Sequence, residues 1–292
     1  MDFFVVSLVL LSAFLHSLRN YVTKKSFNKM LFIWWYGVFA IILYLPFFIF
    51  FLWNNPNFKP GFFIFILASA VIHFFYWIFL SKAYETGDLS AAYPIMRSSP
   101  ALVLLVAVVF LEEQVALTGF SGILLVSLGI YIVGLEGLSL KDFTKPLKSL
   151  FTDKATIYAF LTLLTVTSYS IVDKLGVGYL HSFNYLYIMH FSTFTLLTIY
   201  VSRKYGAKSL IREYEKNRRE IILNAILVFA SYSLTLYAYT FEKVSYIVGL
   251  RQVSVVFGVI LGIAFLKEKH GNYRLAAAAL ITLGAYLITT AK

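Results

Sequence analysis

The chain has 292 residues, of which 60% are hydrophobic and 13% are charged. Soluble globular proteins have about 45–50% apolar and about 25% charged residues, so this composition excludes an ordinary soluble domain and a disordered chain. The sequence has no cysteine, which rules out thiol catalysis, disulfides and cysteine-ligated metal sites. The net charge of +11 does not indicate nucleic-acid binding, because the basic residues lie in short gaps between apolar runs.

Ten apolar runs follow one another along the chain, and each is long enough to cross a bilayer as a helix of about 20 residues. They cover residues 3–23, 31–53, 62–83, 89–111 and 115–135, then 155–173, 182–201, 220–241, 244–266 and 273–290. The first run has neither a preceding basic segment nor a following cleavage site, so we interpret it as a retained span and not as a signal peptide. The sequence therefore predicts an all-α, polytopic membrane protein of ten transmembrane helices.

The two halves of the chain share an internal repeat with an offset of 155 residues. The matching positions are Ala83-Tyr84 with Ala238-Tyr239, Ser90 with Ser245, Phe110-Leu111 and Glu113 with Phe265-Leu266 and Glu268, and Gly129 and Tyr131 with Gly284 and Tyr286. Five spans per half is an odd number, so the two copies must have opposite orientations in the membrane. Inverted repeats of this kind are common in secondary transporters. We divide the chain into a first repeat (1–135), a linker (136–154) and a second repeat (155–292).

Lysine and arginine residues are concentrated in alternate connections. Those after spans 1, 3, 5, 7 and 9 hold about eighteen, whereas the other connections and both tails hold about four. By the positive-inside rule both termini face outside, and the basic segment 203–219 lies in the cytoplasm. In that segment Leu210, Ile211 and Tyr214 share one face, which fits either a short helix on the anionic leaflet or a solvated loop.

The strings YPIMRSSP (93–100), FLEE (110–113) and the glycine-containing segment 122–129 resemble the EamA family of the drug/metabolite transporter superfamily. Residues 250–258 and 266–268, with Gly284, look like the same pattern in the second half. The resemblance covers essentially the whole chain. It implies a central cavity lined mainly by spans 1, 3, 4, 6, 8 and 9 and open alternately to each side. It also implies cytoplasmic termini, opposite to the charge count, which we follow here.

Two arginines fall within predicted spans, Arg97 in span 4 and Arg251 in span 9. Each costs roughly 2.5 to 3.5 kcal/mol near a helix centre on insertion scales, so their presence needs a reason. One reason is structural, because an arginine can snorkel or bind backbone carbonyls freed near Pro94, Pro100 or Gly249. The functional reason is that the guanidinium groups face a cavity and bind a carboxylate or phosphate.

Other polar residues recur at helical spacing in spans 1, 3, 6 and 8. They are Ser12, His16, Asn20 and Thr23; His73, Tyr76, Trp77 and Tyr84; Thr162, Thr165, Tyr169 and Asp173; and Asn224, Ser231, Thr235, Tyr239 and Glu242. We predict that the substrate is bound by Arg97, Arg251, Tyr93, Gln252, Ser254, Ser231, Thr235 and Tyr239. For any single Ser or Thr the alternative is a hydrogen bond that packs two helices together.

Candidates for proton coupling are the titratable residues within or at the ends of spans. They are His16, His73, Glu85 and Glu242, with Asp88 and Asp173 as further members. A histidine inside a span can also be a packing hydrogen-bond partner, and a carboxylate at a span end can simply be interfacial. Glu113 and Glu268 each precede a new helix, so we expect a structural role at the N-terminus of that helix.

No nucleotide-binding, hydrolase or metalloprotease motif occurs in the sequence, so we predict neither an enzyme nor a cofactor or metal site. The predicted function is alternating-access transport of a small organic metabolite with an anionic group, such as an amino acid or its derivative. The alternative is a flippase for a lipid-linked phosphate or a sugar phosphate. A structural or receptor protein would not need an inverted repeat with two buried arginines. We expect the protein in the plasma (inner) membrane of a prokaryotic cell, with no nucleic-acid partner.

Overall fold

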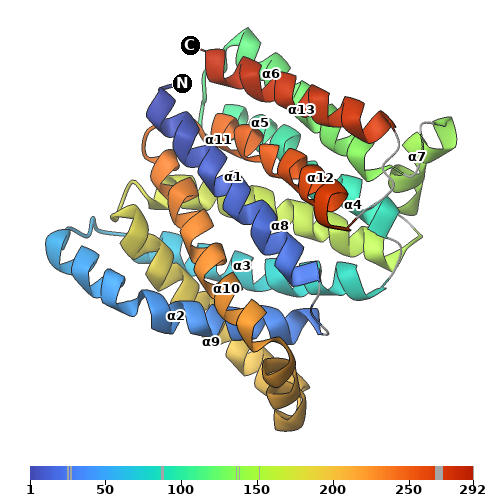
Figure 1. Ribbon diagram of the computed structural model, residues 1–292. Helices are drawn as coiled ribbons and strands as arrows, with labels where there is room; N and C mark the ends of the chain where they lie inside the picture. Colours follow the sequence, from blue (N-terminus) through green and yellow to red (C-terminus); the bar gives the residue numbers. More distant parts are fainter. Residues whose placement is uncertain are drawn as a thin grey trace.

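The computed structural model describes the chain except residues 25, 27, 87–88, 136, 138, 151, 267–271 and 292, and it further omits the side chains of 24, 86, 89–91, 93, 140–141, 261–266 and 272–274. Within the described part all regular structure is α-helical (Figure 1). The helices are α1 (Phe3–Lys24), α2 (Lys29–Asn54), α3 (Phe62–Thr86), α4 (Leu89–Arg97), α5 (Ser99–Phe110), α6 (Leu117–Gly134), α7 (Leu140–Ser149), α8 (Lys154–Gly176), α9 (Ser182–Lys204), α10 (Ala207–Tyr239), α11 (Val244–Arg251), α12 (Val253–Leu266) and α13 (Asn272–Thr290). The all-α prediction is confirmed.

The ten predicted spans correspond to α1, α2, α3, α4 with α5, α6, α8, α9, α10, α11 with α12, and α13. Six helices in the described part are long and apolar enough to cross a membrane on their own, and three shorter apolar helices accompany them. The linker contains α7, whose N-terminus is closed by a reciprocal capping box between Ser139 and Asp142. Hydrogen bonds from the Ser139 hydroxyl and backbone N–H hold the pKa of Asp142 below its usual value.

Spans 4 and 9 are each interrupted by one residue near the middle of the protein. At Ser98 the backbone N–H donates to Ile95 O (3.1 Å), and the hydroxyl donates to Pro94 O (2.6 Å). Pro100 lies in the first turn of α5, where its missing N–H is tolerated. In the second repeat Gln252 N donates to Gly249 O (3.1 Å). Irregular backbone at this depth is tolerated only where protein or a water-filled cavity surrounds it.

Equivalent helices of the two repeats pack against each other in opposite directions. In the α6–α13 pair, Gly122 lies beside Gly284 and Ile288, whereas Gly129 lies beside Ala277 and Ile281. The residue numbers therefore run in opposite senses along the contact, which is the most extensive between any two helices in the described part (Figure 1).

The same inverted relation holds across the rest of the molecule. Helix α1 of the first repeat packs along α10 of the second, and α8 of the second repeat packs along α3 of the first. The two termini meet at one end, where the Met1 amino group donates to Thr289 O (2.8 Å). Ten spans in total place both termini on the same side of the membrane, and this arrangement agrees with the predicted inverted repeat.

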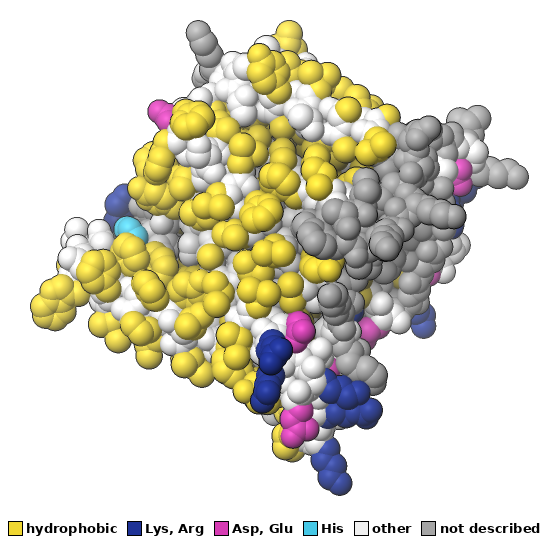
Figure 2. All heavy atoms as spheres, viewed as in Figure 1, with side chains coloured by type: hydrophobic (Ala, Val, Ile, Leu, Met, Phe, Trp, Pro, Cys, Tyr) yellow, Lys and Arg dark blue, Asp and Glu magenta, His cyan; other side chains and the backbone are white. Residues whose placement is uncertain are grey.

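The outer surface is largely apolar, as expected for a protein surrounded by lipid. Figure 2 shows hydrophobic side chains across most of the visible face, and Phe3, Trp53 and Leu117 are each at least 80% exposed. Charged side chains gather at the end where the first part of α10 projects.

Most of the basic segment before span 8 forms the first part of α10, and a kink at Asn217 separates it from the rest of that helix. Tyr214 stacks on Phe39 of α2, and Trp35 Nε1 donates to Leu210 O (3.0 Å). This segment is therefore helical and contacts α2, whereas its predicted position on the anionic leaflet stays a prediction.

Candidate functional site

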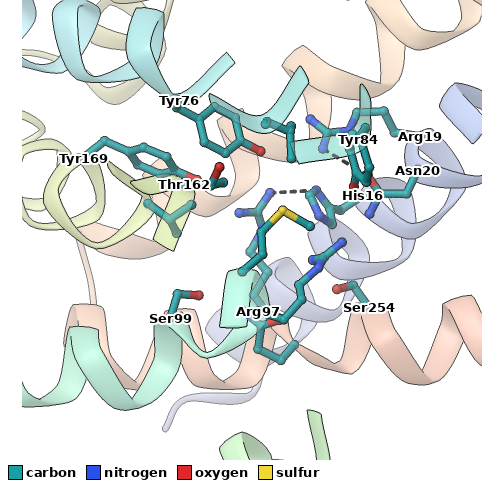
Figure 3. Close-up of a pocket in the computed structure, with 15 residues that line it drawn as sticks. His16, Arg19, Asn20, Tyr76, Tyr84, Arg97, Ser99, Thr162, Tyr169 and Ser254 are labelled. Atoms are coloured by element: carbon teal, nitrogen blue, oxygen red, sulfur yellow. Dashed lines mark hydrogen bonds between the residues drawn. The ribbon is translucent and has the colours of Figure 1, made fainter. Parts of the chain in front are cut away.

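A cavity lies between the two repeats, at the interruptions of spans 4 and 9 (Figure 3). Its empty volume is about 590 Å³, including the space where it opens to the outside. The lining residues come from α1, α3, α4, α5, α8, α11 and α12 and are His16, Arg19, Asn20, Tyr76, Leu80, Tyr84, Met96, Arg97, Ser99, Thr162, Val166, Tyr169, Arg251, Gln252 and Ser254.

Both predicted arginines line this cavity, and each is the last residue of a half-helix. Arg97 ends α4 and Arg251 ends α11. The C-terminus of a helix carries partial negative charge, so a cation is favoured there by typically 0.3–1 kcal/mol, and by more where the site is partly buried. The interruptions therefore help to stabilise two guanidinium groups that would be costly in an unbroken span.

Arg251 is in contact with neutral groups. Its Nη2 donates to His16 Nδ1 (3.3 Å) and to Ser231 Oγ (3.4 Å), and its guanidinium lies over the Tyr232 ring at 5.5 Å. Its Nε is buried without a hydrogen-bond partner among the described residues. Because arginine has no acceptor, His16 Nδ1 must accept this bond, which fixes the proton of neutral His16 on Nε2.

A third arginine, Arg19, lines the same cavity and was not predicted. It lies one turn after His16 on α1, donates from Nη2 to Asn20 Oδ1 (3.1 Å), and packs its guanidinium over Trp77 (5.8 Å). The spacing of three residues from His16 places the two side chains on one helix face, and this signal could have identified it. Figure 3 shows Arg19, His16 and Arg97 turned toward one space, with Tyr76 and Tyr169 across from them.

No aspartate or glutamate is among the described lining residues. The charged side chains among the described lining residues are therefore three arginines, in a partly dehydrated setting where electrostatic attraction to an anion is greater than in water.

The structure brings only part of the predicted binding set to the cavity. Gln252 and Ser254 line it beside the two arginines, whereas Ser231, Thr235 and Tyr239 lie outside the lining. Ser231 and Thr235 bind Ser12 of α1, with Ser12 Oγ at 2.7 Å from Ser231 O and 2.8 Å from Thr235 Oγ1. The side chain of Tyr93 lies outside the described residues.

The coupling candidates are dispersed. His16 lines the cavity, and His73 lies behind it, stacked on Tyr169 at 4.1 Å. Glu85 is exposed and accepts a hydrogen bond from Ser81 (3.1 Å). Glu242 lies after α10, where its carboxylate accepts from Lys243 N (3.0 Å). Asp88 and Glu268 lie outside the described residues.

Glu113 does interact with a helix N-terminus, but the expected partner is wrong. It binds α11 of the other repeat, not the following helix α6. Its carboxylate accepts from Val244 N (2.7 Å), Ser245 N (3.4 Å) and Ser245 Oγ (2.6 Å). The inverted packing of the two repeats places this N-terminus beside the start of α6, so a local reading of the chain could not identify it.

Comparison with known proteins identifies the family. The model of the EamA-like transporter family matches residues 3–135 and 153–290, once for each repeat. The chain belongs to the EamA-like transporter family. It is therefore an integral membrane transporter with a small-molecule substrate, and it is not an enzyme.

The fold of this EamA-like transporter is also found among solved structures. One crystal structure of a protein aligns with a TM-score of 0.69 at 13% identity, covering 98% of this chain and 97% of the other. At this level of identity the similarity shows the fold alone. A search of curated proteins found no match.

Proposed function

We propose that this transporter moves a small organic anion, which binds in the cavity with its carboxylate or phosphate group against Arg97 and Arg251. The observation that supports the proposal most directly is the convergence of three arginines on a cavity whose described lining contains no carboxylate. A guanidinium offers a planar pair of N–H donors that matches both anionic groups.

The balance of charge favours a solute with net negative charge over a zwitterion. A free amino acid would bring an ammonium group into a cavity that already holds three cations, and no lining carboxylate would receive it. An amino acid derivative without the free ammonium, a dicarboxylate or a phosphate ester would avoid this cost.

The rest of the lining suits the carbon skeleton of such a solute. Tyr76, Tyr84 and Tyr169 offer aromatic surface together with hydroxyl groups, and Leu80 and Met96 are apolar. A binding site of this kind orients its ligand with a few polar groups and surrounds the remainder with apolar and aromatic side chains.

Alternating access would come from movement of one repeat against the other around this site. Interrupted helices whose ends meet the substrate are typical of transporters with inverted repeats. The interruptions at Ser98 and Gln252 would let the half-helices on either side move separately.

The proposal is tested by a thermal-shift screen of the purified protein against compounds that share one carbon skeleton and differ in one group. The carboxylate and phosphate members should stabilise the protein, by about 2.7 kcal/mol at 100 times the dissociation constant. The amide and amine members should not. Equal stabilisation by the neutral or cationic members would contradict the anion assignment.

A further inference from the structure

Asp173 of α8 is completely buried and does not line the cavity. Its Oδ1 accepts hydrogen bonds from the Ser69 hydroxyl (2.5 Å) and the Tyr185 hydroxyl (2.7 Å), and its Oδ2 accepts from the Tyr232 hydroxyl. The three donors come from α3, α9 and α10, so one carboxylate joins four helices. Each donor is neutral.

The surroundings of this carboxylate act on its charge in two opposite ways, because three hydroxyl hydrogen bonds favour the ionised form whereas burial without an ion-pair partner disfavours it. No cation of the described residues lies within ion-pair distance of it, and the adjacent Lys174 donates instead to the carbonyls of Tyr239 (2.5 Å) and Glu242 (2.8 Å). Asp173 also lies in the last turn of α8, where the partial charge of the helix end is negative. A buried carboxylate of this kind either remains ionised at a cost or takes up a proton.

A histidine is connected to Asp173 through Ser69. The Nδ1 atom of His73 lies 3.0 Å from Ser69 O and 3.1 Å from Ser69 Oγ. A carbonyl oxygen can only accept, so Nδ1 carries a proton and donates it there. The same N–H is shared with the Ser69 hydroxyl oxygen, and this hydroxyl donates to Asp173, so hydrogen bonds connect His73 to Asp173.

The Asp173 cluster, formed by Asp173, Ser69, His73, Tyr185 and Tyr232, begins where the cavity ends. Along α8 the lining residues Thr162, Val166 and Tyr169 are followed, one turn later and on the same face, by Asp173. Along α3, His73 and Ser69 likewise continue the face of Tyr76 in the direction of Phe62. The cluster therefore separates the cavity from the membrane face that holds the α2–α3 and α8–α9 connections.

The groups that face Asp173 are uncharged, with the exception of Arg251. They are His73 from α3, Tyr169 of its own helix, Tyr185 from α9, Tyr232 and Tyr239 from α10, and, beyond Tyr232, Arg251 from α11. The Arg251 guanidinium lies over the Tyr232 ring, and the Tyr232 hydroxyl donates to Asp173. A substrate anion bound to Arg251 and the charge on Asp173 would therefore both influence Tyr232.

We propose that Asp173 binds the proton that is coupled to transport, and that its ionised form holds the cavity closed toward the α8–α9 connection. This inference rests on the proposed function, since it gives the anion carrier its coupling ion. The proton is taken from a hydronium ion in the open aqueous space, leaving water, and converts the carboxylate to a neutral carboxylic acid. Release on the other side reverses the step.

Protonation changes the hydrogen bonds that join the four helices. The ionised carboxylate accepts from all three hydroxyls, whereas the carboxylic acid has its own O–H to donate. The new O–H needs an acceptor in this buried site, and the hydroxyl oxygens of Ser69, Tyr185 and Tyr232 are the groups already bonded to the carboxylate, so we expect one of these three bonds to reverse. This weakens the connection of α8 to α3, α9 and α10 on the closed side, and rotation of Tyr232 would change the surroundings of Arg251 at the same time.

The first test needs no substrate. Infrared difference spectra of the purified protein, recorded between pH 8 and pH 5, should contain the carbonyl stretch of a buried carboxylic acid. The band should be absent in Asp173→Asn and unchanged in Glu85→Gln, whose carboxylate is exposed. A band that persists in Asp173→Asn, or unmodified protein without any such band, would overturn the proposal.

The second test measures opening of the closed side in this cysteine-free chain. Leu180 is 3% exposed in the α8–α9 connection, and Lys59 is exposed beside it, with Lys59 N donating to Tyr179 O (3.0 Å). Single cysteines replace each residue, and proteoliposomes are labelled with a membrane-impermeant maleimide. The labelling rate of Leu180→Cys is divided by that of Lys59→Cys at each pH, which corrects for the intrinsic effect of pH on thiol reactivity.

This ratio should rise severalfold on acidification in the otherwise unmodified chain and should be high at every pH when Asp173→Asn is added. If Asp173→Asn does not fold, Tyr185→Phe, which removes one of the three bonds, should raise the ratio at neutral pH. A ratio that ignores pH, or that follows sodium instead of pH, would overturn the proposal. Failure of the anion screen with success here would remove the proposed substrate class and leave the proton site in place.

Discussion

At the scale of single residues, the two arginines were predicted from their cost in a span, but their surroundings were not. The sequence marks Arg97 and Arg251 as exceptional because charged residues at such depth are rare. Their partners come from distant parts of the chain, since Arg251 and His16 are 235 residues apart. Arg19 lies in the last turns of span 1, and it was missed although its spacing from His16 places the two side chains on one helix face.

Arg19 should contribute to the affinity for multiply charged anions. We expect Arg19→Gln to weaken binding of a phosphate ester more than binding of the matching monocarboxylate, because the second negative charge loses a cationic neighbour. Arg218→Gln, which changes an exposed arginine of α10, is the control for the loss of one positive charge. The measurement is isothermal titration calorimetry of both ligands. Equal weakening of the two ligands would indicate that Arg19 has only a structural effect.

At the scale of elements, the ten spans followed from apolar length, whereas the interruptions and contacts between helices did not. Pro94 and Pro100 signalled irregular backbone in span 4, but span 9 has no proline, and its interruption at Gln252 depends on tertiary context. The repeat correctly indicated Gly284 as a matched position, although its contact with Gly122 requires the inverted packing of α6 against α13.

Gly284 should be intolerant of even one added methyl group. A Cβ there would lie 2.5 Å from Gly122 O and 2.8 Å from Val126 N, and backbone atoms cannot move aside easily. We expect Gly284→Ala to destabilise the protein by roughly 1–3 kcal/mol, the usual range for overpacking. In Gly258→Ala the nearest atom would be Ser17 Oγ at 3.7 Å, so this control should be neutral or slightly stabilising. Melting temperatures in detergent would compare them, and equal values would contradict the close α6–α13 contact.

At the scale of the whole molecule, the inverted repeat was predictable because an odd number of spans per half leaves no other choice. The orientation in the membrane is a separate question, because the two repeats are related by a pseudo-two-fold axis and present similar structures to the two sides of the membrane. Only the distribution of basic residues distinguishes the sides, and it favours termini outside.

The orientation prediction is tested with two single cysteines in intact cells. Lys208→Cys lies in the basic first part of α10 and should be protected from a membrane-impermeant thiol reagent, whereas Lys59→Cys should react. Both residues are exposed in the protein, so a difference in labelling reports the side of the membrane. The reverse pattern would place both termini in the cytoplasm.

The central claim is that Arg97 and Arg251 hold the anionic group of the substrate. The most direct measurement determines ligand affinity and melting temperature on the same preparations of Arg97→Ala and Arg251→Ala, with the anion that stabilises the unmodified protein most. We predict that each variant folds and binds ten- to hundredfold more weakly, corresponding to roughly 1.5–3 kcal/mol for a charge-assisted hydrogen bond. Lysine at either position should restore only part of the affinity, because it keeps the charge without the planar fork. Unchanged affinity in well-folded alanine variants would contradict the account and remove the reason for assigning an anionic substrate.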